Sequence, residues 1–197
     1  MGLFLDAAIK WDQLSDTSYD ITIGHRHVSK TLHIVFRPID FDHLSGIHYA
    51  KDIDFGLHRR EYRGKKLVQA LISQKLEDTR IEKSVNWSKI SERLSSIIVI
   101  EEILASDFSV YQFNPRKLPF HSAITAAYFL YSEQKQEGIF LFVDQEEALC
   151  YCKSIFKEHG NNYRRNQTRW TVLKKSKRVK DTKTTLFIHP SFQEKSP

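Results

Sequence analysis

The chain has few of the residues that cross-link, bend or break a polypeptide. Its 197 residues include two cysteines, seven glycines and five prolines. One residue separates Cys150 from Cys152, a spacing that suits neither a structural disulfide nor a CxxC metal motif, so both are expected to be reduced core residues. Scarce glycine and proline argue against long linkers. We therefore expect a single domain over residues 1–197, with a frayed tail at 192–197.

Long apolar runs are also missing. The densest run, Ile97–Ile100, is followed at once by Glu101 and Glu102, whereas a membrane-spanning helix needs about 20 mostly apolar residues. The first residues have no cationic start and carry Asp6 inside a short apolar run, which is unlike a signal peptide. A cytoplasmic protein with no membrane partner is expected.

Sequence motifs for several enzyme classes are absent as well. The chain has no P-loop, GxGxxG, HExxH, GxSxG or EF-hand pattern, so nucleotide hydrolysis, dehydrogenase and zinc-protease chemistry have no local support. His25, His27 and His33 lie close in sequence, but no cysteine or acidic cluster accompanies them, and we interpret them as solvated residues. Neither a metal nor a cofactor is expected.

The periodicity of apolar residues predicts helices and a hairpin in the first half of the chain. The region 97–100 is rich in isoleucine and valine, so a strand competes with the helix there. The predicted elements are a short helix within residues 1–14, a β-hairpin formed by Thr17–Ile23 and Thr31–Phe36, and helices over Arg60–Leu76 and Trp87–Ala105.

Strands dominate after Asp107. They are separated by turn-like clusters, which is typical of an antiparallel meander. The predicted strands are Phe108–Phe113, Ala123–Glu133, Gly138–Val143, Ala148–Phe156, Arg169–Lys175 and Thr184–Pro190. We therefore predict an α+β fold, with an N-terminal hairpin and two to three helices packed on one face of a curved antiparallel sheet, the other face being partly open.

Positive charge is concentrated near the C-terminal end. The window 164–183 holds nine Lys and Arg and one acid, a net charge of 9 − 1 = +8, whereas the whole chain carries +6, which leaves 6 − 8 = −2 elsewhere. Trp170, Val172 and Leu173 are interleaved with the cations, which indicates a strand with a cationic face. Phosphate is the expected partner.

Polar and aromatic residues accompany these cations. Gln167 and Thr171 offer amide and hydroxyl groups that can hold a phosphodiester, and Tyr163 and Trp170 can stack on unpaired bases, which favours RNA over duplex DNA. The alternative is core packing for each aromatic residue and a solvated strand face for each lysine. The expected nucleic-acid-binding residues are Arg164, Arg165, Gln167, Arg169, Trp170, Lys175, Lys177 and Arg178.

His43 is the main candidate for proton transfer. It lies between a predicted strand and a predicted helix, beside Ser45, Gly46 and His48, where an imidazole can titrate near the working pH. Alternatively, His43 ties down the loop through hydrogen bonds, and Gly46 supplies a special backbone angle.

Short motifs in this order resemble a known family. They are FDHLSG at 41–46, SIF at 154–156, and Tyr163, Gln167 and TVLK at 171–174. The pattern is similar to that of the fourth group of phage-associated barnase/EndoU/colicin/RelE-like nucleases, in which helices are followed by a sheet of four or more antiparallel strands. The similarity extends over about residues 17–190.

The resemblance implies a metal-independent endoribonuclease from a phage or other mobile element, which cuts RNA such as tRNA or mRNA by attack of the 2′-OH. His43 would then be the general base or acid, Lys174 would stabilise the phosphate, and Thr171, Tyr163 and Ser154 would position it. Two alternatives stay open: a non-catalytic nucleic-acid-binding module, and an interaction protein that modulates host defence or a toxin partner. An acidic inhibitor or antitoxin would fit the +8 window.

Overall fold

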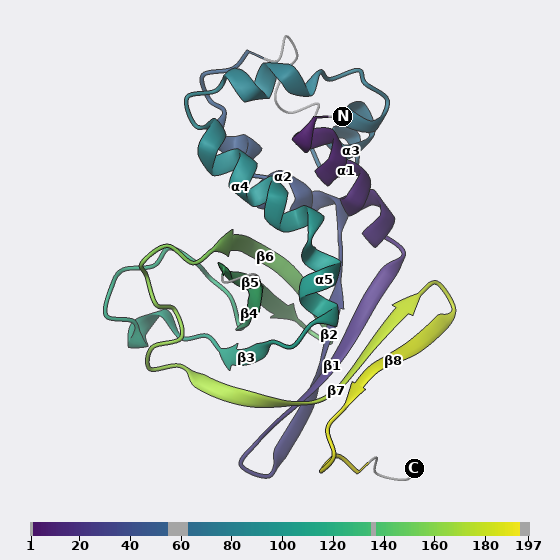
Figure 1. The fold of residues 1–197 in the computed structure, drawn as a ribbon, viewed down its shortest axis with the longest axis vertical. Coiled ribbons are helices and arrows are strands. Elements are labelled where there is room, and N and C mark those ends of the chain that lie inside the picture. The colour runs from purple at the N-terminus through teal and green to yellow at the C-terminus, as the bar shows by residue number, and fades with distance from the viewer. Residues whose placement is uncertain (1, 55–62, 135–136, 194–197) are drawn as a thin grey trace.

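The computed structural model describes residues 2–54, 63–134 and 137–193, in which helices gather at one end of a body built from strands (Figure 1). The α-helices are α1 (Leu3–Leu14), α2 (Phe41–Leu44), α3 (Lys65–Ile72), α4 (Trp87–Ile98) and α5 (Ile100–Ala105), and short 3₁₀ turns are η1 (Pro38–Asp40), η2 (Ile47–Tyr49), η3 (Asp78–Lys83) and η4 (Pro115–Lys117). The strands are β1 (Thr17–His25), β2 (Val28–Val35), β3 (Ser109–Gln112), β4 (Tyr128–Gln134), β5 (Glu137–Glu146), β6 (Leu149–Lys157), β7 (Thr168–Val179) and β8 (Thr182–Ile188).

Seven of these strands close into a barrel. The strand order is β1-β2-β6-β5-β4-β3-β7-β8, and an additional pairing of β1 with β7 closes the ring and leaves β8 outside it, on β7. The pair β2–β6 is parallel, and the other pairs are antiparallel. The prediction of helices packed on a curved, open antiparallel sheet is therefore wrong: the sheet is mixed and closed, and the helices lie at one end of the barrel (Figure 1).

The length of β7 explains the closure. Its 12 residues offer two long edges. One edge pairs with β1 from Gly24↔Thr171 to Thr17↔Val179, and the other pairs first with β3 and then with β8. An open sheet would leave the free edge of β1 exposed, and closure removes that edge. The pairing joins segments from opposite ends of the chain, so no local pattern in the sequence indicates it.

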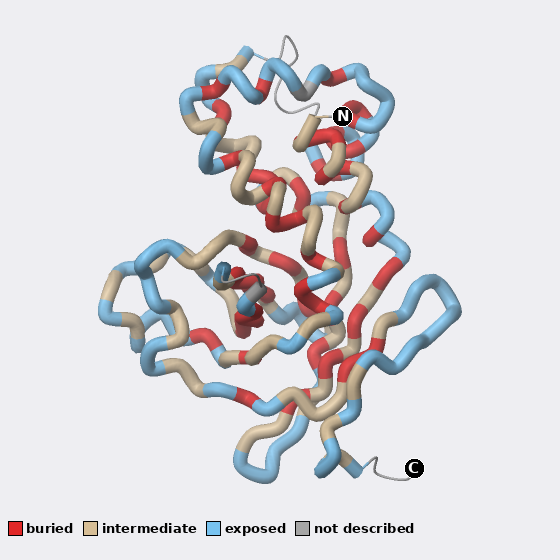
Figure 2. Tube along the Cα trace, in the orientation of Figure 1, coloured by how far each residue is buried: buried red, intermediate tan, exposed pale blue. Residues whose placement is uncertain are grey.

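The interior of the barrel continues into the helical end as one apolar core. Alternate residues of β1 and β2, among them Ile21, Ile23 and Leu32, are fully or almost fully buried, as are Phe4 and Trp11 on α1. In Figure 2 the buried segments run from the strands into the inner sides of the helices. Because a strand exposes alternate residues to opposite faces, one set of side chains suffices to fill the barrel.

A second, aromatic cluster lies on the outside of β4 and β5. Leu130 and Leu141 belong to the interior core, whereas Phe129 and Phe140, one residue away on each strand, belong to the second cluster. These outward-facing rings are still fully buried. Residues of the segments 113–127 and 158–167 pack over them, among them Leu118 and Tyr163.

Several predicted elements are confirmed. The N-terminal helix and the β-hairpin are present as α1, β1 and β2. The predicted helix at 87–105 is divided at Val99 into α4 and α5, so region 97–100 is not a strand. For the helix predicted at 60–76, residues 60–62 lie outside the described part, and α3 covers 65–72. Within the predicted tail, residues 194–197 also lie outside it.

The two cysteines are reduced core residues, as predicted. Cys150 and Cys152 are buried and unbonded, and burial raises the pKa of the Cys150 thiol to about 11. No helix in the described part of the chain is long and apolar enough to cross a membrane.

Candidate active site

Two histidines meet where α2 turns into η2. Phe41 and Leu44 are fully buried and hold α2 against the core, and Gly46 reverses the chain in a left-handed conformation with φ of 74°. This turn places the His48 ring against the His43 ring. The two rings stack, with centroids 5.0 Å apart and an interplanar angle of 8°. His43 itself is exposed at the surface.

Arg93 of α4 lies against this turn. A Cβ atom at Gly46 would come within 2.8 Å of the Arg93 Cδ atom, and the guanidinium carbon is 5.5 Å from the centroid of the Tyr49 ring. The Arg93 Nη1 and His48 Nδ1 atoms are buried and have no hydrogen-bond partner among the described residues. An unpaired buried polar group costs roughly 1–3 kcal/mol, so both atoms lie where an added hydrogen-bonding group would be stabilising.

A bulge in β6 supplies a second cation. Phe142 pairs with Ser154 and Val143 pairs with Cys152, so Lys153 is the extra residue. The ladder between β2 and β6 ends at Val35↔Tyr151, and beyond that point α2 and α4 pack against β6. Lys153 on β6 is therefore close enough to His43 on α2 for its charge to act on that imidazole.

These neighbours lower the pKa of both imidazoles. Partial burial of the His43 ring is the largest cause, the charges of Arg93 and Lys153 add to it, and Asp40 opposes them. For His48 the causes are burial, then His43 and Arg93, and a hydrogen bond with the Asp42 backbone opposes them. Both rings are therefore neutral near pH 7, as a general base must be.

The arrangement combines two neutral imidazoles with two cations, Arg93 and Lys153. Imidazoles can take up and release a proton, and fixed cations can stabilise charge that develops on a phosphate. Among the described residues, no group of three or more His, Cys, Asp or Glu is placed to hold a metal ion. This cluster of His43, His48, Arg93 and Lys153 is called the histidine cluster below.

The other predicted catalytic residues are divided between two regions. Ser154 follows Lys153 on β6 and is 5% exposed. Tyr163 packs on the aromatic cluster, with its ring centroid 5.6 Å from that of Phe156 on β6. Thr171 and Lys174 lie on β7, opposite Gly24 and Thr22 of β1. Around the barrel, β1 and β2 separate β7 from β6 on one side, and β3, β4 and β5 separate them on the other.

Three partly buried members of the predicted nucleic-acid-binding set have polar partners within the protein. Arg164 is 3.2 Å from a Glu158 oxygen and lies over the Tyr131 ring. The Gln167 side chain accepts a hydrogen bond from the Asn114 amide and donates one to the Asn114 carbonyl. Lys177 forms an ion pair with Glu101 of α5.

Two further predicted residues are buried. Trp170 is 7% exposed and belongs to the interior core. Lys175 is 3% exposed and donates to the carbonyls of Ala105 and Ser106 at the C-terminal end of α5, where a cation is electrostatically favoured.

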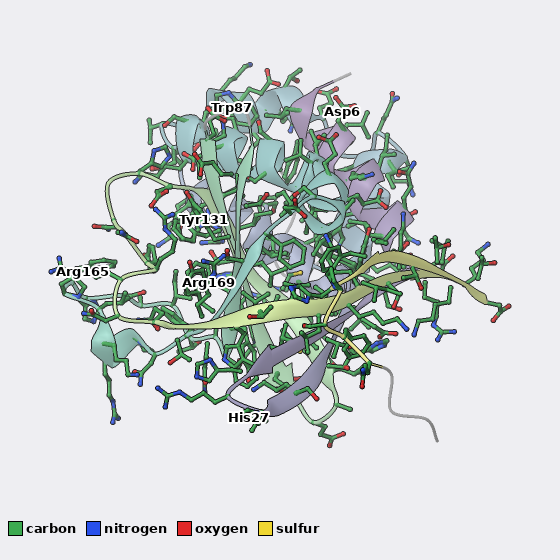
Figure 3. The ribbon with its side chains drawn as sticks, turned by 60° about the horizontal axis from the view of Figure 1, so that its bottom comes forward. Asp6, His27, Trp87, Tyr131, Arg165 and Arg169 are labelled. Carbon is green, nitrogen blue, oxygen red and sulfur yellow. The ribbon has the colours of Figure 1, made fainter. Side chains whose placement is uncertain are left out.

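The remaining predicted cations are exposed. Arg165 lies in the loop before β7, and Arg169 and Arg178 lie on β7 itself. In Figure 3 Arg165 lies at the outer edge of the molecule, and Arg169, on β7, lies closer to its middle. The exposed positive charge is therefore spread along one loop and one strand.

Sequence reasoning missed two members of the histidine cluster. Arg93 is one of several polar residues of α4, and Lys153 is one of several lysines on the strands. Neither has a local signature, because α4 and β6 meet α2 only in the folded chain. His48 was visible beside His43, but its stacking on that ring depends on the left-handed turn at Gly46.

The histidine cluster places two imidazoles beside two cations, a combination that acid–base chemistry on a phosphodiester can use. The family model described as phage-Barnase-EndoU-ColicinE5/D-RelE like nuclease 4 matches residues 4–190. The chain belongs to this nuclease family, which confirms the resemblance in its motifs and supports a nucleic-acid substrate. No curated protein and no solved structure matches the chain.

The turn at Gly46 leads to a first prediction. Gly46→Ala is expected to lower the free energy of unfolding by about 1–2 kcal/mol, since a side chain in the left-handed region is strained. The new methyl group would also displace Arg93. Cleavage by the folded variant should therefore fall as well. Thermal denaturation and a cleavage assay measure the two effects.

Gly160 provides a matched control. It has a similar φ of 69°, but a Cβ atom there would meet nothing within 4 Å. Gly160→Ala should show the backbone strain alone and keep its activity. Equal activity of the two variants would contradict the role that we assign to the contact between Gly46 and Arg93.

Proposed function

We propose that this protein is a metal-independent endoribonuclease, encoded by a phage or another mobile element, which cleaves RNA through its own 2′-OH group. The observation that carries the proposal is the histidine cluster: two stacked imidazoles beside Arg93 and Lys153, whose pKa values are lowered by partial burial and by the nearby positive charge. Membership of the nuclease family supports the broader class.

The reaction requires two proton transfers. One imidazole accepts the proton of the 2′-OH as that oxygen bonds to phosphorus. The bond from phosphorus to the 5′ oxygen breaks, and the protonated second imidazole donates a proton to that oxygen. The products are a 2′,3′-cyclic phosphate and a 5′-OH end. A bound phosphodiester would raise the pKa of the pair and so help the second imidazole to carry its proton.

Arg93 and Lys153 have the electrostatic role in this proposal. Negative charge grows on the non-bridging oxygens as the 2′ oxygen attacks, and donors fixed beside those oxygens stabilise it. Ser154, next to Lys153, would help to position the phosphate. We propose that Thr171 and Lys174 act away from this point, along the RNA backbone on β7.

The exposed cations around β7 would hold the rest of the substrate. Arg165, Arg169 and Arg178 suit phosphate contacts that confer affinity without sequence preference. An acidic inhibitor protein would fit the same surface, because opposite charge speeds association and favours the correct partner. We propose RNA as the substrate and such an inhibitor as a further partner.

A cleavage assay in EDTA tests the proposal. Purified protein is expected to cut total RNA in the presence of the chelator and to leave 2′,3′-cyclic phosphate ends, because the nucleophile is the 2′-OH and no metal takes part. An oligonucleotide with a single 2′-deoxy residue at the cleavage position is the control and should resist cleavage there. Cleavage that requires a divalent ion, or that proceeds at the deoxy position, would overturn the mechanism. Salt-sensitive RNA binding without any product would assign the protein to the non-catalytic binding modules.

A further inference from the structure

A groove opens where β3 and β8 diverge on the same edge of β7. The ladder between β3 and β7 ends at Val110↔Trp170, and the ladder between β7 and β8 begins at Lys174↔Ile188. The space between them is a groove of about 390 Å³, near the lower end of ligand-pocket volumes of roughly 300–1,000 Å³. It is separate from the histidine cluster, which lies beside β6.

Two aromatic rings contribute to the walls of this groove. Phe108 precedes β3 and Phe187 lies near the end of β8, and both are only partly buried. The Lys175 ammonium lies between them, 4.7 Å from the centroid of the Phe108 ring and 5.7 Å from that of Phe187. Hydrogen bonds to the carbonyls of Ala105 and Ser106 fix the position of the Lys175 ammonium. Its cation–π contacts with Phe108 and Phe187 in turn help to orient the two rings.

Polar groups complete the lining. Asp107, Arg169 and Thr171 are exposed at the groove, and Ser109 is partly buried. Trp170 also lines it, is 7% exposed, and has a buried Nε1 atom without a partner among the described residues. The lining thus combines aromatic faces, a carboxylate acceptor, hydroxyl groups and an arginine.

This combination suits a nucleobase better than a phosphate alone. A base has a flat face that stacks on aromatic rings and an edge whose N–H groups can donate to a carboxylate or hydroxyl. The exposed Arg169 can meanwhile contact the adjoining phosphate. A base within a duplex is stacked and paired, so only an unpaired base can enter such a groove.

We infer that the groove formed by β3, β7 and β8 binds an unpaired nucleobase of a single-stranded RNA substrate. The inference rests on the proposed function for the identity of the nucleic acid. It gives this enzyme a base subsite on a different side of the barrel from the cleavage centre. The substrate class is therefore RNA with an unpaired segment long enough to reach both.

The test measures binding without cleavage. The full chain carrying His43→Ala is titrated with a short fluorescein-labelled single-stranded RNA and with a duplex of the same length. Adding Phe187→Ala, or separately Phe108→Ala, is expected to weaken single-strand binding about tenfold, because stacking on the ring is lost. Duplex binding should stay unchanged. Asp107→Asn should change the preference among single strands of different base composition.

Leu186→Ala is the matched control. Leu186 precedes Phe187 on β8 and is 38% exposed, but it is not among the residues that line the groove. Its replacement should leave both affinities unchanged. Near-ultraviolet circular dichroism checks that each variant keeps its packing. Single-strand affinity that is unaffected by both phenylalanine replacements in folded protein would overturn the inference.

The outcomes separate the groove from the cleavage mechanism. If wild-type protein cleaves RNA but the phenylalanine variants bind single strands normally, the base subsite is wrong and the proposed nuclease stands. If wild-type protein cleaves nothing but its single-strand binding depends on both rings, the catalytic proposal fails and the groove stands as a binding site.

Discussion

His43→Ala is expected to reduce kcat/KM for RNA cleavage by about 10²–10⁴-fold, the usual contribution of one general acid or base. His43 lies at the surface and stacks on His48. Partial burial of its ring, with the charges of Arg93 and Lys153, lowers its pKa and favours the neutral form that can accept a proton. The variant should fold, because His43 lies on the surface. Single-turnover cleavage of a labelled oligonucleotide measures the loss.

His121→Ala is the control for this substitution. His121 is also an exposed histidine, but it lies in the segment between β3 and β4, outside the histidine cluster. Its replacement should leave the rate unchanged. A His43→Ala variant that is folded and as active as wild type would remove His43 from the mechanism, whatever the family of the protein.

The pH dependence follows from the lowered pKa values. As pH falls through the pKa of the pair, the imidazoles become protonated and the base is lost, so the rate declines on the acid side. Because both pKa values lie below the ordinary 6.5, the midpoint of this acid limb in kcat/KM is expected below pH 6.5. The midpoint belongs to the stacked pair, since the two rings titrate together.

Protein stability should respond in the same direction. Below pH 6.5 the unfolded chain binds protons on these histidines more readily than the folded chain does. The two histidines therefore lower the free energy of unfolding as the pH falls below 6.5. Above pH 6.5 both states carry neutral histidines and this effect vanishes.

Arg93→Ala is expected to reduce kcat/KM by about 10²–10³-fold, as the loss of one fixed donor to a developing oxyanion does. The guanidinium is held beside the turn at Gly46, and its Nη1 atom is buried and unpartnered among the described residues. The same charge lowers the pKa of both histidines. Its removal should therefore also shift the acid limb of the pH profile to higher pH.

The pH shift distinguishes an electrostatic role from a structural one. Arg93→Lys keeps the charge and loses the forked donor, so it should keep the wild-type acid limb while cleaving more slowly. Lys89→Ala, an exposed cation one turn earlier on α4, should change neither quantity. A rate loss in Arg93→Ala without movement of the acid limb would show that Arg93 does not act on the histidines.

Local patterns in the sequence predicted much of the chain correctly. The alternation of apolar residues at 17–36 predicted the β1–β2 hairpin, and the spacing near one turn of helix predicted α1 and α4. The short motifs at 41–46, 154–156 and 163–174, taken in order, indicated the nuclease family that the family comparison confirms. These features depend on neighbours a few residues apart, which is the range over which propensity and periodicity act.

Other predictions depended on surroundings that the sequence does not reveal. Lys175 and Trp170 were both predicted to bind nucleic acid, with core packing as the alternative for Trp170. Both are buried, because β7 passes between the core and the end of α5. Arg164 and Lys177 meet acidic partners from other elements. The positive charge of the window 164–183 is thus partly neutralised by acidic residues from elsewhere in the chain, and these ion pairs form only on folding.

The sequence by itself determined most of the elements, the family, and the motif that contains His43. Only the tertiary structure decided that the sheet closes, that β2 and β6 run parallel, and that Arg93 and Lys153 come to His43 from α4 and β6. The physical reason is the separation in sequence of the partners. Strand closure and site assembly depend on which strand edges and helix faces fit one another in three dimensions. The periodicity of residues along the chain does not specify these long-range pairings.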